Sequence, residues 1–313
     1  MTPAFTSRPD VLVIGESVMD IISDGREELH RPGGSPMNVA VGLARLGHRT
    51  ELLTQLGDDA EGDAIRQHLT DAGVTIHPGS ITAAPTSTAI ATLQADGSAS
   101  YEFTIEWSLA ATHVGAPRIL HTGSIGAIVE PGAREVRRVI EQQNHSLISF
   151  DPNIRPAIMG ARDHVRQLVE SLSAHAHIVK MSDEDTAWLY PGASTRAVLD
   201  ALISVGVALA IVTLGADGCA LMTPSLFLRL AAVPTTVVDT VGAGDSFTSA
   251  LLSEILRLEL VETVRTGDLT SEQASRLAQR ALTAAAITVS RQGAQPPTAD
   301  DLEKQAVDQA MQD

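Results

Sequence analysis

Cysteine is almost absent from this sequence of 313 residues, which contains only Cys219. A single cysteine cannot form an intramolecular disulfide or build a cysteine metal cluster, so both of these stabilising devices are excluded. The neighbours of Cys219 are small or apolar, which predicts a buried structural thiol. With 44% hydrophobic and 19% charged residues, the composition is typical of a folded soluble protein and not of a disordered chain.

Positive charge is also scarce. The chain has 22 Lys and Arg against 38 Asp and Glu, which gives a net charge of −16. Such a surface repels nucleic acid and anionic lipid, and no run of basic residues offsets it, so we expect neither as a partner. An anionic substrate such as ATP would need local backbone dipoles and Mg²⁺ to overcome this field.

Long apolar runs are missing as well. The longest uncharged stretch lies between Asp200 and Asp217 and is shorter than the roughly 20 residues that span a bilayer. The first apolar run, residues 11–14, is too short for the core of a signal peptide. These two features predict a cytoplasmic protein.

The sequence is rich in a repeated succession of a short apolar run, a turn and an amphipathic helix. Strands that alternate with helices pair in parallel through crossovers, so we predict a single α/β domain over residues 1–313 with a mostly parallel sheet covered on both faces. The predicted strands are 11–14, 51–55, 119–121, 147–150, 178–181 and 208–214. The predicted helices are 38–46, 64–72, 134–143, 164–173 and 196–205, with a last helix from Ala299.

One region departs from this succession. Residues 86–93 and 98–105 alternate with a period of about two, and Asp96-Gly97 lies between them. Asp-Gly favours a tight hairpin turn because both residues tolerate positive φ. We therefore predict an antiparallel insertion at about residues 86–107, which is either a lid over a ligand site or an edge hairpin without such a role.

The strongest local motif is VVDTVGAGD at residues 237–245, which leads into a predicted amphipathic helix. We expect Gly242, Ala243 and Gly244 to form the first helical turn, where backbone N–H groups have no intrahelical partner. Small residues let an anion approach these donors, and the helix dipole favours its negative charge. A carboxylate beside such a cradle, here Asp245, is suited to accept a proton from an attacking hydroxyl.

A second motif, RPGGSPMNVA at residues 31–40, also enters a predicted helix. Gly33 and Gly34 let the backbone approach a ligand, and Asn38 offers both a donor and an acceptor. Asp20 follows the first predicted strand, which suggests a place at the carboxyl edge of the sheet, where open α/β sheets bind ligands. Together these groups are suited to polyol recognition, although each alone is often a cap or a turn.

These two motifs, at this separation, resemble the two signatures of the PfkB, or ribokinase-like, carbohydrate kinases over nearly the whole chain. The resemblance implies a three-layer α/β/α domain with a small β lid, and a homodimer formed through that lid. It implies ATP and a small sugar as substrates, with Asp245 as the catalytic base and residues 242–244 as the anion hole. It places Asp20, Gly33, Gly34 and Asn38 at the sugar, and Lys180, Ser182, Thr213, Gly215, Gly218, Gly242, Gly244 and residues 290–293 near ATP.

The sequence departs from the family pattern at one place. Members often carry Asn-x-x-Glu before a helix, where it acts on magnesium and phosphate through water, whereas this chain has Ser182 and Asp185. Their hard oxygen atoms are suited to Mg²⁺, and they are equally suited to capping a helix. Asp239 and the Val241 carbonyl resemble a site for a monovalent cation, such as K⁺, that is found in some members.

The segment DPNIRP at residues 151–156 resembles that of fructokinases and 2-keto-3-deoxygluconate kinases. Arg155 is suited to a carboxylate, to sugar oxygens or to a structural ion pair. The resemblance of residues 15–20 together with 182–185 to the fructokinase-like pattern of the family favours phosphorylation of fructose. The alternatives are a 2-keto-3-deoxygluconate kinase and, less compatible with the sequence, a nucleoside kinase.

Two other classes of protein are less compatible with the sequence. A dinucleotide-dependent oxidoreductase would need a Gly-x-Gly-x-x-Gly turn after the first strand, and this chain lacks one there. A catalytically silent sugar-binding regulator could use the same scaffold, since a fold does not fix a function. The intact Asp245 and its glycines argue against that alternative.

Overall fold

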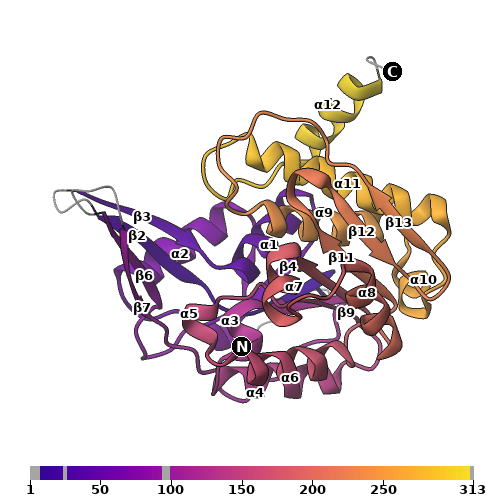
Figure 1. Ribbon diagram of the computed structural model, residues 1–313. Helices are drawn as coiled ribbons and strands as arrows, with labels where there is room; N and C mark the ends of the chain where they lie inside the picture. The colour runs from indigo at the N-terminus through magenta and orange to yellow at the C-terminus, as the bar shows by residue number, and fades with distance from the viewer. Residues whose placement is uncertain (1–7, 24–26, 94–98, 311–313) are drawn as a thin grey trace.

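The computed structural model describes residues 8–23, 27–93 and 99–310 (Figure 1). In this part of the chain a nine-stranded sheet has the order β13-β12-β11-β10-β9-β8-β1-β4-β5. Neighbouring strands run parallel except in the pairs β11–β12 and β12–β13. The strands are β1 Val11–Ile14, β4 Thr50–Leu53, β5 Thr75–Ile76, β8 Ile119–Gly123, β9 Leu147–Asp151, β10 Ile178–Ser182, β11 Leu209–Thr213, β12 Cys219–Met222 and β13 Phe227–Leu230.

Helices cover both faces of this main sheet, which confirms the predicted three layers. Alternate residues of β1 show why: Val11 and Val13 belong to one apolar cluster, whereas Leu12 and Ile14 belong to the other. The first cluster includes residues of α1, α2, α9, α10 and α11, and the second includes residues of α3, α4, α6, α7 and α8. In Figure 1, α9 and α11 lie above the main sheet and α4 and α6 lie below it.

The helix bounds extend the predicted ones by a few residues, mainly at their N-termini. Tertiary packing decides such ends, because a capping group need not be recognisable in the sequence. The helices are α1 Ser35–Arg45, α2 Ala60–Asp71, α3 Ser124–Ile128, α4 Gly132–Gln142, α5 Pro156–Met159, α6 Arg162–Ser173, α7 Asp183–Leu189, α8 Thr195–Ser204, α9 Ala243–Arg257, α10 Val261–Thr266, α11 Ser271–Val289 and α12 Ala299–Ala310.

A smaller four-stranded sheet, with the order β3-β2-β6-β7, projects from one side of the main body (Figure 1). The predicted antiparallel pair is present as β6 Thr88–Leu93 and β7 Ala99–Thr104, while its Asp96-Gly97 turn lies outside the described residues. The other two strands are β2 Val18–Ser23 and β3 Glu28–Gly33. The prediction for Asp20 was therefore wrong in one respect: this residue lies within β2 of the small sheet, because the chain leaves the main sheet at residues 15–17.

Among the described residues, no helix is both long and apolar enough to cross a membrane. The cytoplasmic location stays a prediction. The buried thiol is confirmed, since Cys219 lies fully inside the main sheet.

Candidate active site

The two sequence motifs meet where α1 packs against α9. The hydroxyl of Ser35 donates a hydrogen bond to Oδ1 of Asp245 at 2.6 Å, and the amide of Asn38 donates to its Oδ2 at 2.8 Å. The helices come this close at Gly42, where a Cβ atom would lie 2.4 Å from the hydroxyl of Ser249. Both oxygens of the Asp245 carboxylate are thus held in place while the residue remains partly exposed.

The start of α9 explains why its motif is built from small residues. Gly242 precedes the helix with φ 78°, a left-handed conformation that favours glycine, so the prediction that it forms the first turn was wrong. A Cβ atom at this position would also lie 2.6 Å from the Cβ of Ala294. The N–H of Ala243 donates to the Thr240 carbonyl at 3.3 Å. The N–H groups of the next residues, Gly244 and Asp245, are in the first turn, where helix geometry gives them no intrahelical acceptor.

A buried ion pair lies next to the start of α9. Lys180 Nζ in β10 donates to Oδ2 of Asp151, at the end of β9, over 2.8 Å, and both side chains are buried. The same Nζ lies 2.8 Å from where a Cβ atom of Gly244 would be. The ammonium group of Lys180 therefore lies next to Gly244 in the first turn of α9, where its positive charge can reinforce the attraction of the helix start for an anion.

Burial and the neighbouring charges shift the pKa values of both members of this pair. Burial raises the pKa of Asp151 to about 6 although Lys180 acts to lower it, and the carboxylates of Asp185 and Asp245 add to the rise. Burial alone would lower the pKa of Lys180, but the hydrogen bond and charge of Asp151 together with the charges of Asp185 and Asp245 outweigh it, and the pKa is raised. Lys180 thus remains a cation among three carboxylates.

Asp185 and Ser182 form a capping box at the start of α7. The N–H of Asp185 donates to the Ser182 hydroxyl at 3.0 Å, and the Ser182 N–H donates to Oδ2 of Asp185 at 2.8 Å. The other carboxylate oxygen accepts the N–H of Ile154 at 2.8 Å. Within the described residues, no three His, Cys, Asp or Glu side chains are grouped so that they could hold a metal ion. The helix-capping role of these two residues is present, and the described protein groups do not by themselves form a metal cage.

The predicted sugar residues lie where the small sheet joins the main body. The Asp20 carboxylate lies against Gly33, because a Cβ atom there would be 2.3 Å from Oδ2 of Asp20. Gly34 has φ 109° and packs on the carbonyl of Glu16. The exposed Arg155 guanidinium donates to the Ile154 carbonyl at 3.0 Å. Burial raises the pKa of Asp20 to about 6, and the charge of Arg155 only partly opposes this rise. Arg155 thus acts on Asp20 through its charge and has no carboxylate as a direct partner among the described residues.

The predicted nucleotide residues follow neighbouring strands. Ser182 and Thr213 are register partners at the carboxyl ends of β10 and β11. The turn after Thr213 uses two glycines with positive φ, Gly215 at 54° and Gly218 at 87°. A Cβ atom at Gly218 would lie 2.0 Å from the Leu230 carbonyl, so this glycine shapes the connection to the β12–β13 hairpin.

Asp239 ties the loop before α9 to the turn after α11. Its Oδ1 accepts the N–H of Val241 at 3.0 Å, and its Oδ2 accepts the N–H of Gly293 at 2.8 Å. These two hydrogen bonds lower the pKa of Asp239, and the charge of Arg31 in the small sheet acts in the same direction. The predicted 290–293 region is therefore adjacent to the motif that begins α9.

Sequence reasoning missed three functional candidates. Ser35 holds Asp245, Asp151 pairs with Lys180, and Glu16 is fully buried beside Gly126, whose N–H donates to Oε2 at 2.7 Å. Burial raises the pKa of Glu16 to about 7. Glu16 and Asp151 both lie at the carboxyl end of a predicted strand, which was the available signal. Ser35 directly follows the glycine pair but has no such signal of its own.

The chain was compared with known protein families and with curated proteins. The sequence model described as pfkB family carbohydrate kinase matches residues 8–301. A fructokinase of Rhizobium leguminosarum bv. trifolii is 30% identical over 280 residues, which cover 85% of this chain and 85% of that protein. Probable fructokinase-2 of Arabidopsis thaliana is 29% identical over 322 residues, which cover 94% of each chain.

Solved structures of kinases are also similar to this chain in fold. A double mutant of fructokinase from Vibrio cholerae, with fructose, ADP and a potassium ion bound, superposes with a TM-score of 0.77 at 27% identity and covers 92% of this chain and 95% of that chain. Aminoimidazole riboside kinase from Salmonella enterica, bound to aminoimidazole riboside and an ATP analogue, gives 0.76 at 26% identity, with 94% and 98% covered.

We predict that Lys180→Met lowers the free energy of unfolding at pH 8 by about 3–5 kcal/mol, because it leaves the buried Asp151 carboxylate without its partner. The folded-state pKa of Asp151 is already raised, to about 6. A raised carboxyl pKa means that the cost grows as the pH rises through it and shrinks below it. The loss at pH 5 should therefore be smaller than at pH 8, as measured by urea denaturation.

The double variant Asp151→Asn/Lys180→Met serves as the control. It removes both charges and should recover most of the lost stability. An equal loss at both pH values, or no recovery in the double variant, would contradict the role given to this pair.

Proposed function

The chain belongs to the pfkB family of carbohydrate kinases and has its ribokinase-like α/β fold, and from this premise we propose that its substrate is fructose. It is an ATP-dependent kinase that phosphorylates a sugar hydroxyl. Fructose is supported by the relatives of this chain, several of which are fructokinases or probable fructokinases. The observation that carries the catalytic assignment is the fixed carboxylate of Asp245 beside the N–H groups that open α9.

In the proposed reaction, Asp245 is the base. The sugar hydroxyl attacks the γ-phosphorus in line, its proton passes to the Asp245 carboxylate, and the bond between the phosphorus and the bridging oxygen of ADP breaks. Ser35 and Asn38 hold the Asp245 carboxylate in one orientation, so orienting the base adds little to the activation free energy of phosphoryl transfer. The anion hole is proposed at Gly242, Ala243 and Gly244 and stabilises the charge on the transferring group. The N–H of Ala243 already donates to the Thr240 carbonyl, so the open donors of the first turn are those of Gly244 and the adjacent Asp245.

The ATP site proposed here follows the ends of β10 and β11. Ser182, Thr213, Gly215 and Gly218 form its far side, and Gly242 and Gly244 form the side next to the sugar. Lys180 lies beneath Gly244 and contributes positive charge through the backbone cradle without being exposed to solvent. This arrangement is supported by the carboxyl-end position of these residues in a parallel sheet.

The cation sites are proposed on charge and donor chemistry. Asp151, Asp185 and Asp245 bring more negative charge to this edge than Lys180 offsets. Magnesium bound with ATP would supply the missing positive charge. It commonly retains several waters, which fits Asp185, whose oxygens already accept two backbone N–H groups. Asp239 and the Val241 carbonyl offer hard oxygen ligands for K⁺, an ion also found in the Vibrio cholerae fructokinase.

The sugar site is proposed to comprise Asp20, Gly33, Gly34, Asn38 and Arg155. The small sheet, with the segment at 86–107, would then act as a lid on a single kinase domain. A polyol that enters between this sheet and α9 would meet Asp20 and Arg155 on one side and Asp245 on the other. 2-Keto-3-deoxygluconate remains the alternative substrate, because its carboxylate would give Arg155 a charged partner.

We also propose that two copies associate through the small sheet. Its outer strands β3 and β7 carry Leu29 and Phe103 with exposed fractions of 46% and 40%. Large apolar side chains on the two outer strands of a small sheet favour burial against a second copy.

The assignment of the base predicts that Asp245→Asn lowers kcat by at least the roughly 10²–10⁴-fold typical of general-base catalysis while ATP still binds. A coupled assay of ADP release with fructose measures turnover, and calorimetric titration measures ATP binding. Asp268→Asn, an exposed site on the loop after α10, is the matched control and should leave both unchanged. Near-normal turnover in Asp245→Asn would contradict the assignment, and sugar binding without any turnover in the unaltered protein would favour a silent regulator.

The choice of substrate predicts that the unaltered enzyme has a higher kcat/KM for fructose than for 2-keto-3-deoxygluconate. Arg155→Ala should reduce kcat/KM for fructose by no more than about tenfold, equivalent to ~1.4 kcal/mol, since hydroxyls are weaker partners of guanidinium than carboxylates. Assays of both sugars with both proteins test this. A preference for the sugar acid that disappears in Arg155→Ala would promote the alternative substrate.

The dimer predicts that Leu29→Glu combined with Phe103→Glu converts a dimer into a monomer in light scattering coupled to gel filtration. Val205→Glu is the control, because Val205 is also 46% exposed but lies at the end of α8, outside the small sheet. A monomeric unaltered protein, or a dimer that survives the double substitution, would contradict the proposed association.

A further inference from the structure

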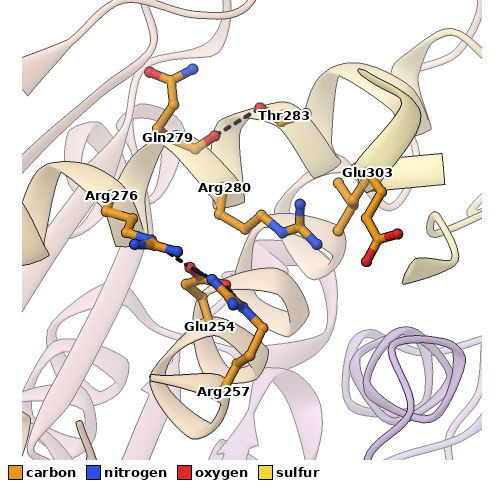
Figure 2. Close-up of a pocket in the computed structure, with 8 residues that line it drawn as sticks. Glu254, Arg257, Arg276, Gln279, Arg280, Thr283 and Glu303 are labelled. Carbon is orange, nitrogen blue, oxygen red and sulfur yellow. Dashed lines mark hydrogen bonds and ion pairs between the residues drawn. The ribbon is translucent and has the colours of Figure 1, made fainter. Parts of the chain in front are cut away.

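A hollow of about 410 Å³ lies between α9, α11 and α12, away from the site described above. Figure 2 shows it as a cluster of three arginines around a glutamate, with a second glutamate on α12 opposite. Its charged and apolar lining includes Glu254, Arg257, Arg276, Arg280, Leu302 and Glu303. At ~1.5 Å per helical residue, Arg257 lies about 18 Å along α9 from Asp245, so this hollow is separate from the reacting atoms.

Glu254 holds two of the arginines in place. Its buried carboxylate accepts a two-point hydrogen bond from Arg257, at 2.7 and 2.6 Å, and a third hydrogen bond from Arg276 at 3.1 Å. Burial acts to raise the pKa of Glu254, but the hydrogen bonds of Arg257 and Arg276 and the charges of Arg257 and Arg280 together outweigh it, and the pKa is lowered. Each guanidinium has five N–H donors, and Glu254 uses only part of them. Both arginines line the hollow and are about half exposed, at 51% and 55%, so their remaining donors are accessible to a ligand.

Arg280 is the third arginine of the hollow and, unlike Arg257 and Arg276, has no hydrogen bond to a carboxylate among the described residues. Among the described residues it makes no hydrogen bond or ion pair within 4.0 Å, although it is half-buried between α9 and α12. Burial lowers its pKa, Arg257 and Arg276 lower it further, and Glu254 and Glu303 oppose this. A half-buried guanidinium that faces two like charges is stabilised when an anion binds between them.

From this geometry we propose that the hollow is a binding site for a small phosphomonoester dianion. One carboxylate already occupies the inner side of the arginine cluster, and the unused N–H donors of three guanidinium groups come from two helices. A tetrahedral phosphate accepts hydrogen bonds from several directions at once, which fits this arrangement better than a second planar carboxylate. The volume leaves room for an organic group beside the phosphate, with Leu302 as an apolar contact.

The position of this cluster in the whole chain strengthens the proposal. The net charge of −16 repels anions from most of the surface, so a specific anion site needs a local concentration of basic side chains. Glu254 and Glu303 do not neutralise the cluster, because three arginines face two carboxylates. Arginine is the side chain whose rigid fork of donors best matches phosphate.

Calorimetric titration of the intact protein tests the proposal. A non-hydrolysable ATP analogue at saturation blocks the nucleotide site, and ionic strength is kept constant. Fructose 6-phosphate is the phosphomonoester probe, with orthophosphate and malonate as comparison ligands. We expect fructose 6-phosphate to bind more tightly than orthophosphate, because it also fills the hollow, and malonate to bind more weakly than both.

The matched variants are Arg280→Gln, Arg280→Lys and Arg134→Gln, the last at an exposed arginine on α4 far from the hollow. Arg280→Gln should weaken binding of fructose 6-phosphate roughly 10- to 100-fold, as expected for the loss of charge-assisted hydrogen bonds. Arg280→Lys should recover part of the affinity, and Arg134→Gln should behave as the unaltered protein. Thermal unfolding and basal turnover, both expected to be unchanged, show that each variant folds.

Three results would overturn the proposal. The first is no binding of fructose 6-phosphate to the unaltered protein when the nucleotide site is blocked. The second is an equal effect of Arg280→Gln and Arg134→Gln, which would indicate a general charge effect. The third is tighter binding of orthophosphate or malonate than of fructose 6-phosphate, which would exclude a phosphomonoester as the ligand.

Discussion

Two hydrogen bonds to the carboxylate of Asp245 join parts of the chain that are 210 and 207 positions apart. They can form only because α1 and α9 approach closely, and this approach depends on Gly42, where a side chain would collide with Ser249. The same contact brings the glycine pair at residues 33–34 and the small residues at 242–244 into one site. The arrangement of the candidate active site thus depends on the packing of α1 against α9. This packing also fixes the orientation of the proposed base, Asp245.

A second constraint is electrostatic. A kinase with a net charge of −16 has to bind a polyanionic nucleotide, and the edge proposed for it also carries Asp151, Asp185 and Asp245. Backbone N–H groups at the start of α9 and the buried Lys180 provide positive potential there without a basic surface. The buried pair is costly to form but leaves Lys180 in one position, directly under Gly244. The same logic applies at the far end of α9, where Glu254 holds two arginines on the wall of a hollow.

The two sheets contribute different groups of residues to the candidate site. The main sheet aligns the carboxyl ends of its parallel strands, so that residues of β9, β10 and β11 come together although they are distant in sequence. The small sheet presents Asp20 and Gly33 from a separate direction and carries Arg31 close to the turn at Gly293. With the proposed sites, the edge of the main sheet would hold the nucleotide while the small sheet covers the sugar and excludes water.

The sequence by itself determined the fold class, the order of most strands and helices, and the two motifs that belong to a carbohydrate kinase, because hydrophobic periodicity and glycine-rich turns are local properties. The sequence-based predictions were wrong where the position of a residue depends on contacts that a local sequence pattern does not specify. Asp20 was expected at the edge of the main sheet but lies in β2, and Gly242 caps α9 instead of forming its first turn. Only the tertiary structure decided that Ser35 and Asn38 hold Asp245, that Lys180 pairs with Asp151, and that Arg280 remains without a close partner among the described residues. Each of these depends on which helices and strands become neighbours, and that is set by packing over the whole chain and not by any one segment.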